Sequence, residues 1–177
     1  RDTLLEHILL AAKEIAGADG GTLYLLSPEE DVLEYVIVRT DSLGIAYGGT
    51  TGQKPPFNIV RLYDAQTGAT NLRKQVVSAV VKKETINIDD VYESDAFDFS
   101  GTQAFDLQYG FRTRSVITVP MLNHRGEAIG CVQLINAKDP KTGATVDFSD
   151  EVAEIIASLV SQAAVIVDKE TLISQQK

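Results

Sequence analysis

The sequence predicts an α+β fold: a central antiparallel sheet, with an N-terminal and a C-terminal helix packed on one face and a lid of loop and short helix on the other. Apolar residues follow helical spacing at both ends of the chain, whereas the segments between them are mostly rich in β-forming residues. The chain has 177 residues, of which 44% are hydrophobic, so it can bury one sizeable core. We therefore expect a single domain over residues 1–177.

An amphipathic helix is expected over residues 1–16. Its apolar side chains recur with helical spacing from Leu4 to Ala16, and the glycines that follow end the pattern. Two β-rich segments come next, at Gly21–Leu26 and Val32–Thr40, and the residues between them suit a turn. They predict a β-hairpin that opens the sheet and lid region, residues 21–138.

The stretch from Asp41 to Pro56 is rich in glycine and proline, so we expect a long loop with little regular structure. The residues after it predict a short strand at Phe57–Tyr63, a helix at Asn71–Lys83 and a strand at Thr85–Ile88. The helix is expected to turn its valines inward: Val76, Val77, Val80 and Val81.

The lid is expected between Asp89 and Tyr109. Its Asp, Ser and aromatic residues show no clear periodicity before a short helix at Thr102–Tyr109. The strongest strand patterns follow the lid, at Arg114–Leu122 and Glu127–Ala137, and a compact turn joins them into a second hairpin.

A long closing helix is expected over residues 149–174. Ser149 suits the N-cap, Asp150 and Glu151 suit the positive end of the helix dipole, and apolar residues then continue at helical spacing. Because the chain opens directly with a helical pattern, we expect it to be part of a larger protein, with an output domain after the closing helix.

Several motifs resemble those of one known family. Gly110–Ser115, Val119–Pro120 and Gly130–Asn136 are similar to the core motifs of GAF domains, with Thr22–Leu26 and Ile86–Val91 in supporting positions. Their order and spacing resemble those of the GAF domains of cyclic-nucleotide phosphodiesterases. The resemblance implies a regulatory sensor domain that encloses a small ligand between sheet and lid and signals through its terminal helices by a population shift. It also implies a homodimer formed through these helices.

Some members of this family bind cyclic nucleotides, and others bind other molecules or none, so the fold alone does not name the ligand. The resemblance implies cyclic AMP, cyclic GMP or another small molecule. For a phosphate, free backbone amides are expected at the helix start near Val76. The expected ligand-binding residues are Thr22, Val76, Asp106, Tyr109, Thr113 and Gln133.

One family motif is degenerate in this chain. In the cyclic-nucleotide-binding members an Asn–Lys pair is followed by Phe and then Asp–Glu, and the resemblance implies that a Lys–Asp pair holds the pocket together. Here Ala137 separates Asn136 from Lys138, and Asp150 follows Phe148 too closely. A dimerisation module without a ligand is therefore the alternative function.

Gln133 interrupts an apolar strand, on the face that it is expected to share with Ile129, Cys131 and Ile135. An unpaired buried amide there would cost about 1–3 kcal/mol. Either a neighbouring loop or bound water satisfies this amide, or a ligand does.

Composition excludes several other partners. A net charge of −9 repels nucleic acid and anionic membrane surfaces.

Charged residues near the lid have structural readings. Arg112 and Arg114 are expected to point to one face and form surface salt bridges. The acidic residues of the lid lack the spacing of a calcium-binding loop, so no metal is expected.

No catalytic residue is expected. The two histidines, His7 and His124, are too few for a multi-histidine metal centre. Cys131 is expected to pack within a strand; a redox activity of its thiol is a third hypothesis, which burial of that thiol would dispose of. A single cysteine also suits a reducing, cytoplasmic location.

Overall fold

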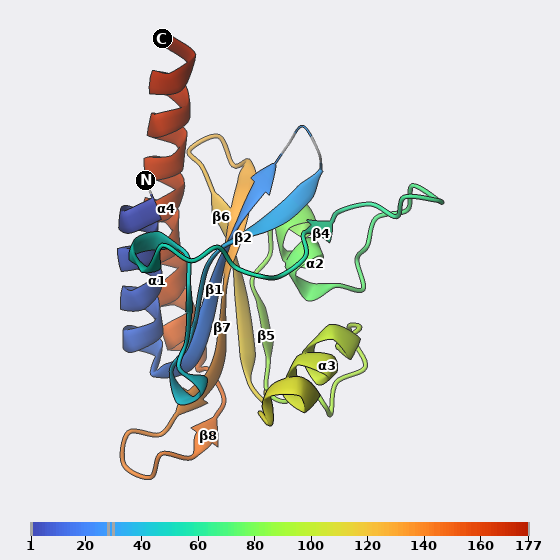
Figure 1. Cartoon of the computed structure of the whole chain (residues 1–177), viewed down its shortest axis with the longest axis vertical. Coiled ribbons are helices and arrows are strands. Elements are labelled where there is room, and N and C mark those ends of the chain that lie inside the picture. The colour runs from blue at the N-terminus through green and yellow to red at the C-terminus, as the bar shows by residue number, and fades with distance from the viewer. Residues whose placement is uncertain (1, 28, 30, 177) are drawn as a thin grey trace.

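The computed structural model describes the backbone of residues 2–27, 29 and 31–176, and side chains up to residue 169 (Figure 1). In this part of the chain the helices are α1 (Asp2–Ala16), α2 (Gln75–Lys82), α3 (Ser100–Tyr109) and α4 (Asp150–Gln176). The strands are β1 (Ala18–Ser27), β2 (Val32–Thr40), β3 (Ile45–Tyr47), β4 (Val60–Arg61), β5 (Ile86–Ile88), β6 (Val116–Leu122), β7 (Ala128–Lys138) and β8 (Thr145–Val146).

All of these strands join one antiparallel sheet. Its order is β3-β2-β1-β7-β6-β5, while β4 pairs with β2 and β8 pairs with β7. The two predicted hairpins are β1–β2 and β6–β7. They meet in the middle of the sheet, because β1 also pairs with β7. The predicted α+β class with a central antiparallel sheet is confirmed.

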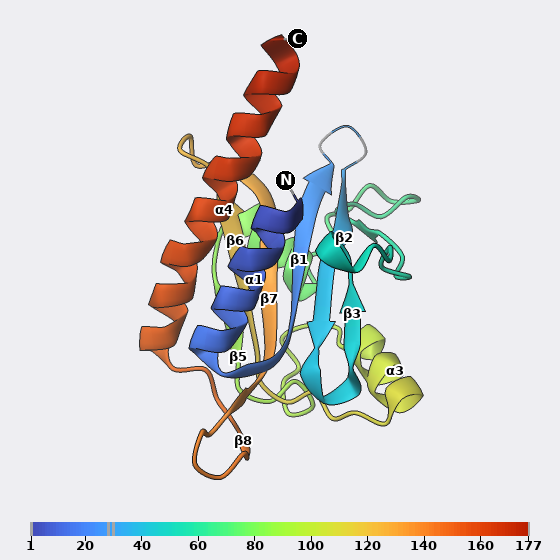
Figure 2. The ribbon, with the colours of Figure 1, turned by 60° about the vertical axis from the view of Figure 1, so that its left-hand side comes forward.

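The terminal helices α1 and α4 lie side by side on one face of the sheet (Figures 1 and 2). Leu5 and Leu9 of α1 and Ile156 and Val160 of α4 are fully buried there, against sheet residues such as Leu23. Each buried side chain of this size stabilises the fold by about 1.5–3 kcal/mol. This core therefore fixes both helices to the same face, as predicted.

The start of α4 has the predicted cap. Ser149 Oγ accepts a hydrogen bond from the Val152 backbone N–H at 3.1 Å. Asp150 and Glu151 occupy the first turn, where negative charge favours the helix dipole. Within the described residues, neither α4 nor another helix is long and apolar enough to cross a membrane.

The opposite face of the sheet carries α2 and α3 (Figure 1). Val77 and Val80 of α2 pack with Tyr24, Leu33 and Cys131 in a second apolar cluster. The prediction that Val81 also turns inward is wrong, since its side chain is 39% exposed. A short helix has only one side toward the sheet, and Val81 lies off that side.

The stretch expected as a loop, residues 41–56, is more regular than predicted. It contains β3 and two 3₁₀ turns, Asp41–Leu43 and Gly49–Thr51. β3 forms because its residues pair with the end of β2, and a strand of three residues is too short for local composition to reveal.

Two further boundaries differ from their predictions. The strand expected at Phe57–Tyr63 is reduced to β4, and the helix expected from Asn71 begins only at Gln75. The cause is Asn71 itself, whose side-chain amide donates to the carbonyl of Arg61 and whose backbone N–H bonds the next carbonyl. These bonds tie the chain into a turn before α2 begins.

Candidate functional site

A cavity of about 280 Å³ lies between the sheet and the helices α2 and α3, on the face away from the terminal helices. Its walls come from β1, β2 and β7, from the segment before β4 and from the starts of α2 and α3. Among the residues expected to bind a ligand, Thr22, Val76, Thr113 and Gln133 line it. The fold brings these four together from distant parts of the chain, and their contact with a ligand stays a prediction.

Aromatic side chains form one wall of the cavity. The ring centroids of Tyr24 and Tyr35 are 4.7 Å apart, and those of Tyr35 and Phe57 are 5.2 Å apart. Burial, and then the neighbouring Tyr35, raises the pKa of Tyr24 well above its ordinary value, so this hydroxyl stays neutral. Sequence reasoning missed the wall, because the pairing of Tyr24 with Tyr35 depends on the hairpin register, which shifts between Leu23 and Tyr24. Such a wall suits a flat ring.

A polar row crosses the sheet beneath the cavity. Thr22 of β1, Gln133 of β7 and Thr118 of β6 are register partners, and Gln133 Nε2 donates to Thr118 Oγ1 at 3.3 Å. Thr118 on a neighbouring strand thus pairs with the Gln133 amide nitrogen, where either a loop or water, or a ligand, was expected. Ile129 does not share this face as predicted but packs with the terminal-helix core, because an irregularity near this end of the hairpin shifts the register.

The starts of α2 and α3 both reach the cavity. Lys74 is the N-cap of α2 and makes no side-chain hydrogen bond to the helix. At α3, Asp98 accepts a hydrogen bond from the Ser100 backbone N–H at 2.9 Å, and this bond is the main reason why the pKa of Asp98 is lowered. Lys74 and Asp98 are the charged residues of the described lining, so the cavity is nearly neutral and meets two positive helix ends.

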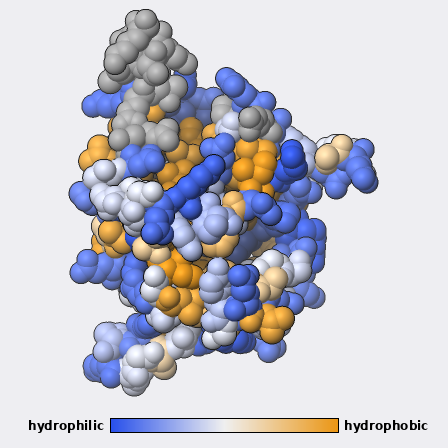
Figure 3. All heavy atoms as spheres, viewed as in Figure 1, coloured by the Kyte–Doolittle hydropathy of each residue, from blue (hydrophilic) through white to orange (hydrophobic). Residues whose placement is uncertain are grey.

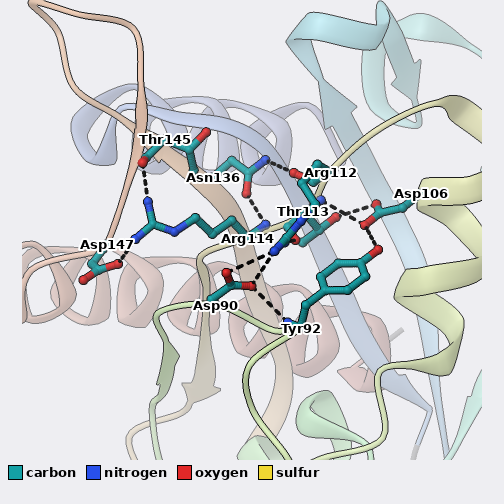
Figure 4. Close-up of polar contacts among 9 residues, drawn as sticks. All are labelled: Asp90, Tyr92, Asp106, Arg112, Thr113, Arg114, Asn136, Thr145 and Asp147. Carbon is teal, nitrogen blue, oxygen red and sulfur yellow. Dashed lines mark hydrogen bonds and ion pairs between the residues drawn. The ribbon is translucent and has the colours of Figure 1, made fainter.

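Asp106 and Tyr109 lie outside the cavity lining. Asp106 is buried, and its carboxylate accepts hydrogen bonds from the Thr113 backbone N–H at 2.9 Å, the Thr113 hydroxyl at 2.8 Å and the Tyr92 hydroxyl at 2.6 Å (Figure 4). Tyr109 packs on Phe105 instead, with ring centroids 4.6 Å apart. The hydrogen-bond acceptors of Asp106 are therefore occupied by groups of the protein itself. These bonds hold α3 against Thr113.

Arg112 and Arg114 form the expected salt bridges, but with partners in different segments (Figure 4). Arg112 lies 3.0 Å from Asp90, and its guanidinium group stands 4.0 Å from the centre of the Tyr92 ring. Arg114 lies 2.9 Å from Asp147. One arginine thus holds the lid, and the other holds the segment that leads into α4.

Asn136, from the degenerate family motif, has a structural position. Its side-chain oxygen accepts a hydrogen bond from the Arg114 backbone N–H at 2.7 Å, and its side-chain nitrogen donates to the Arg112 backbone carbonyl at 2.9 Å (Figure 4). The displaced Lys138 pairs with buried Asp19 at 2.7 Å. Burial alone would raise the pKa of Asp19, but hydrogen bonds from Lys138 and Ser42 outweigh it and the pKa is lowered.

Residues 48–59, which we call the strap, connect the cavity to α1. The strap begins beside α1, where the Thr50 N–H and hydroxyl both donate to the Glu6 carboxylate at 2.7 Å. Arg39 of β2 pairs with the same carboxylate at 2.8 Å. The strap then crosses the edge of the sheet formed by β2 and β3 and reaches the cavity wall with Phe57 (Figures 1 and 2). It thus links opposite faces of the sheet.

Glycine is required where the strap meets Glu6. Gly49 has a φ of 62°, and a Cβ there would lie 1.9 Å from Glu6 Oε2. Burial by itself would raise the pKa of Glu6, but the Thr50 hydrogen bonds and the Arg39 charge outweigh it and the pKa is lowered. Glu6 is therefore held as a carboxylate beneath the strap.

The redox hypothesis is not supported at Cys131. The thiol is fully buried, and burial raises its pKa far above the ordinary value, so it supplies no thiolate at neutral pH. Among the described residues, no three His, Cys, Asp or Glu side chains gather in a way that would hold a metal ion.

An antiparallel sheet with both terminal helices on one face and a partly lidded cavity on the other defines a small α+β domain with a candidate ligand site. The chain belongs to the GAF domain family, whose model matches residues 1–167. GAF domains are regulatory sensor domains of signalling proteins.

Solved structures of low identity share this fold. The GAF domain of a phosphoenolpyruvate-protein phosphotransferase from Coxiella burnetii superposes with a TM-score of 0.69 at 11% identity, covering 98% of this chain and 86% of that one. The second GAF domain of DevS from Mycobacterium smegmatis superposes with a TM-score of 0.62 at 14% identity, covering 99% and 98%.

Among curated proteins, the chain is similar to a cGMP-specific 3',5'-cyclic phosphodiesterase of Drosophila virilis. The two are 33% identical over 73 residues, which are 41% of this chain and 7% of that protein. The match thus spans a small part of the length of this relative.

Proposed function

We propose that this chain is a sensor domain that binds a small flat molecule in the cavity and transmits the binding to α1 and α4. The observation that carries the proposal is the cavity itself, in which an aromatic wall faces a polar row and two helix starts. Concave sites that are largely apolar, with a few placed polar groups, are typical of small-molecule binding. Thr22, Thr113 and Gln133 would supply the polar contacts.

A cyclic nucleotide, cyclic AMP or cyclic GMP, is the first ligand to test. The curated relative in Drosophila virilis is named a cGMP-specific phosphodiesterase. The aromatic wall suits a base, and the helix starts with Lys74 beside them suit a phosphate. Asp106 and Tyr109 would reach such a ligand only if α3 moved, because both lie outside the lining.

Two connections support transmission to the terminal helices. The strap joins Phe57 in the cavity wall to Glu6 on α1. On the other side, Thr113 lines the cavity, and Ser115 just after it donates to the Val146 carbonyl at 2.7 Å, in the segment that leads into α4. Ligand binding would shift the population between two arrangements of these contacts.

The same proposal includes a homodimer formed through the terminal helices, in a cytoplasmic signalling protein with an output domain after α4. Large apolar side chains are exposed on both helices: Leu4 and Ile15 are each 50% exposed, Ile155 is 51% and Val165 is 52% exposed. Hydrophobic residues also reach the surface on the helix side of the molecule, at the left of Figure 3. Paired copies would bury these side chains.

The direct test is calorimetric titration with cyclic AMP and cyclic GMP. We expect saturable binding of at least one, and a loss of about fivefold or more in affinity in Gln133→Leu, because the polar row loses an amide. Gln108→Leu, at an exposed position of α3, is the matched control and should bind like the wild type. Absence of binding of both nucleotides at millimolar concentration would rule out the cyclic-nucleotide proposal.

A dimerisation module without a ligand is the second candidate function. It is favoured by Asp106 and Asn136, whose hydrogen-bonding groups are occupied within the protein. Native mass spectrometry of the chain purified without denaturation separates the two functions. A retained small molecule supports the sensor, whereas a bare dimer together with no binder in a metabolite panel supports the module.

A further inference from the structure

Two buried side-chain oxygens among the described residues have no hydrogen-bond partner, Gln75 Oε1 and Asn87 Oδ1. Asn87 already has a structural role, since its amide nitrogen donates to the Phe148 carbonyl at 2.9 Å. Gln75 is only 8% exposed, lines the cavity and has no such explanation. A buried acceptor without a partner lowers the stability of the fold, so its position in a cavity wall points to a partner that comes from outside.

The surroundings of Gln75 define what that partner must offer. Gln75 is the first residue of α2, where backbone N–H groups have no partner inside the helix and where the N-cap Lys74 supplies none. Free donors therefore lie beside the unpaired acceptor, and the side-chain amide adds a donor of its own. A phosphate or a carboxylate presents acceptors alone and would leave Gln75 Oε1 unpaired.

We propose that Gln75 is a specificity-determining residue of the cavity and that it binds a neutral, amide-like edge, with a hydrogen-bond donor beside an acceptor. Carboxamides, lactams and purine bases carry such an edge, and a glutamine side chain pairs with it in a bidentate manner. The inference rests on the proposed function, that the cavity takes a small molecule.

The aromatic wall agrees with this chemistry. Tyr24, Tyr35 and Phe57 line the same cavity as Gln75, so a ring that carries the amide-like edge can pack on them. In a cyclic nucleotide the base would then meet Gln75. Its phosphate would lie at the start of α3, where Ser100, Gly101 and Thr102 line the cavity.

Nicotinamide and nicotinate test the proposal, because the two compounds share one ring. Nicotinamide carries a carboxamide on it, whereas nicotinate carries a carboxylate. We expect the wild-type chain to bind nicotinamide more tightly than nicotinate by about fivefold or more, as measured by NMR titration. Gln75→Met keeps the length of the side chain and should abolish this preference. Gln103→Met, at an exposed position of α3 outside the lining, should retain it.

Thermal unfolding without ligand supplies a second readout. Gln75→Met should raise the midpoint, because it removes an enclosed acceptor that has no partner, and Gln103→Met should leave it unchanged. A lower or unchanged midpoint in Gln75→Met, or a preference for nicotinamide that survives the substitution, overturns the role of Gln75 and leaves the sensor function standing. If the wild type binds neither ring compound, the proposal for Gln75 fails, whereas the sensor function is decided separately by the metabolite panel and native mass spectrometry.

Discussion

At the scale of single residues, Asp106 lies outside the cavity lining and holds a lining residue, Thr113, in place. Its carboxylate accepts three hydrogen bonds, two of them from Thr113, whose side chain lines the cavity. Hydrogen bonds to a charged and buried group are worth more than neutral ones, and their loss leaves the Thr113 donors unpaired. Asp106 therefore holds both the position of Thr113 and the packing of α3.

Asp106→Ala is expected to lower the free energy of unfolding by roughly 2 kcal/mol, since Thr113 and Tyr92 lose their acceptor. Urea denaturation measures this change. Glu93→Ala, at an exposed lid position, is the control and should stay within about 0.5 kcal/mol of the wild type. Equal stability of the two variants would contradict the role given to Asp106.

Cys131 should react with iodoacetamide only after unfolding. The thiol is fully buried and its pKa is raised by burial, so native protein offers neither access nor a thiolate. Mass spectrometry of labelled samples, with and without urea, measures the reaction. Fast labelling of the native chain would revive the redox hypothesis.

The sequence predicts some site residues and not others for a physical reason. Gln133 stands out because it interrupts an apolar strand, whereas Gln75 follows polar residues at the beginning of a helix, where glutamine is ordinary. Only the packing of α2 against the sheet shows that Gln75 is enclosed. The positions of Asp106 and Tyr109 likewise depend on how α3 is turned, and a helix with weak apolar periodicity does not reveal this.

At the scale of elements, the strap has the clearest structural requirement. Gly49 and Gly52 both have positive φ angles, 62° and 68°, but only Gly49 has a neighbour in the way of a Cβ. An alanine at either position has to adopt the left-handed backbone conformation, which costs about 1–2 kcal/mol. The difference between the two isolates the contact with Glu6.

Gly49→Ala should therefore be less stable than Gly52→Ala by about 1 kcal/mol or more, because the strap has to move away from Glu6. Chemical denaturation of the two variants measures the difference. If they unfold at the same denaturant concentration, the strap is not held on α1 as the structure describes.

The Glu6 contact also makes a defined contribution to pH dependence. The folded-state pKa of Glu6 is lowered, so the ionised side chain stabilises the fold at neutral pH, and this stabilisation is lost as the pH falls below about 4.3, the ordinary value for Glu, toward the folded-state pKa. Glu6→Gln should lower stability at pH 7 and narrow its gap to the wild type as the pH falls toward 3. A gap that is constant with pH would contradict the assignment.

At the scale of the whole molecule, hydropathy periodicity predicted the layers. Apolar spacing predicted both terminal helices, both hairpins and the face of the sheet on which the helices pack. Burial in one core imposes that spacing. β3 and β8 form by pairing with the strands that precede them, and the strap is held by its contact with Glu6. Such short segments carry too little local pattern to show this.

The proposed dimer makes its own prediction. Replacing Ile155 and Val165 by Glu should shift the sedimentation behaviour of the chain to that of a monomer, because charges would replace exposed apolar side chains on α4. Leu107→Glu changes a side chain that is 88% exposed on α3 and should leave the assembly intact. Dissociation in the control as well, or in neither variant, would argue against this interface.

The central claim, a ligand cavity that signals to the terminal helices, is tested most directly by heteronuclear NMR titration with cyclic AMP, cyclic GMP and a metabolite panel. For at least one compound, the backbone signals of cavity residues such as Thr22, Gln75, Thr113 and Gln133 should shift saturably, together with signals of the strap and α1. Cavity signals that stay unchanged at millimolar concentrations of every compound would contradict the claim.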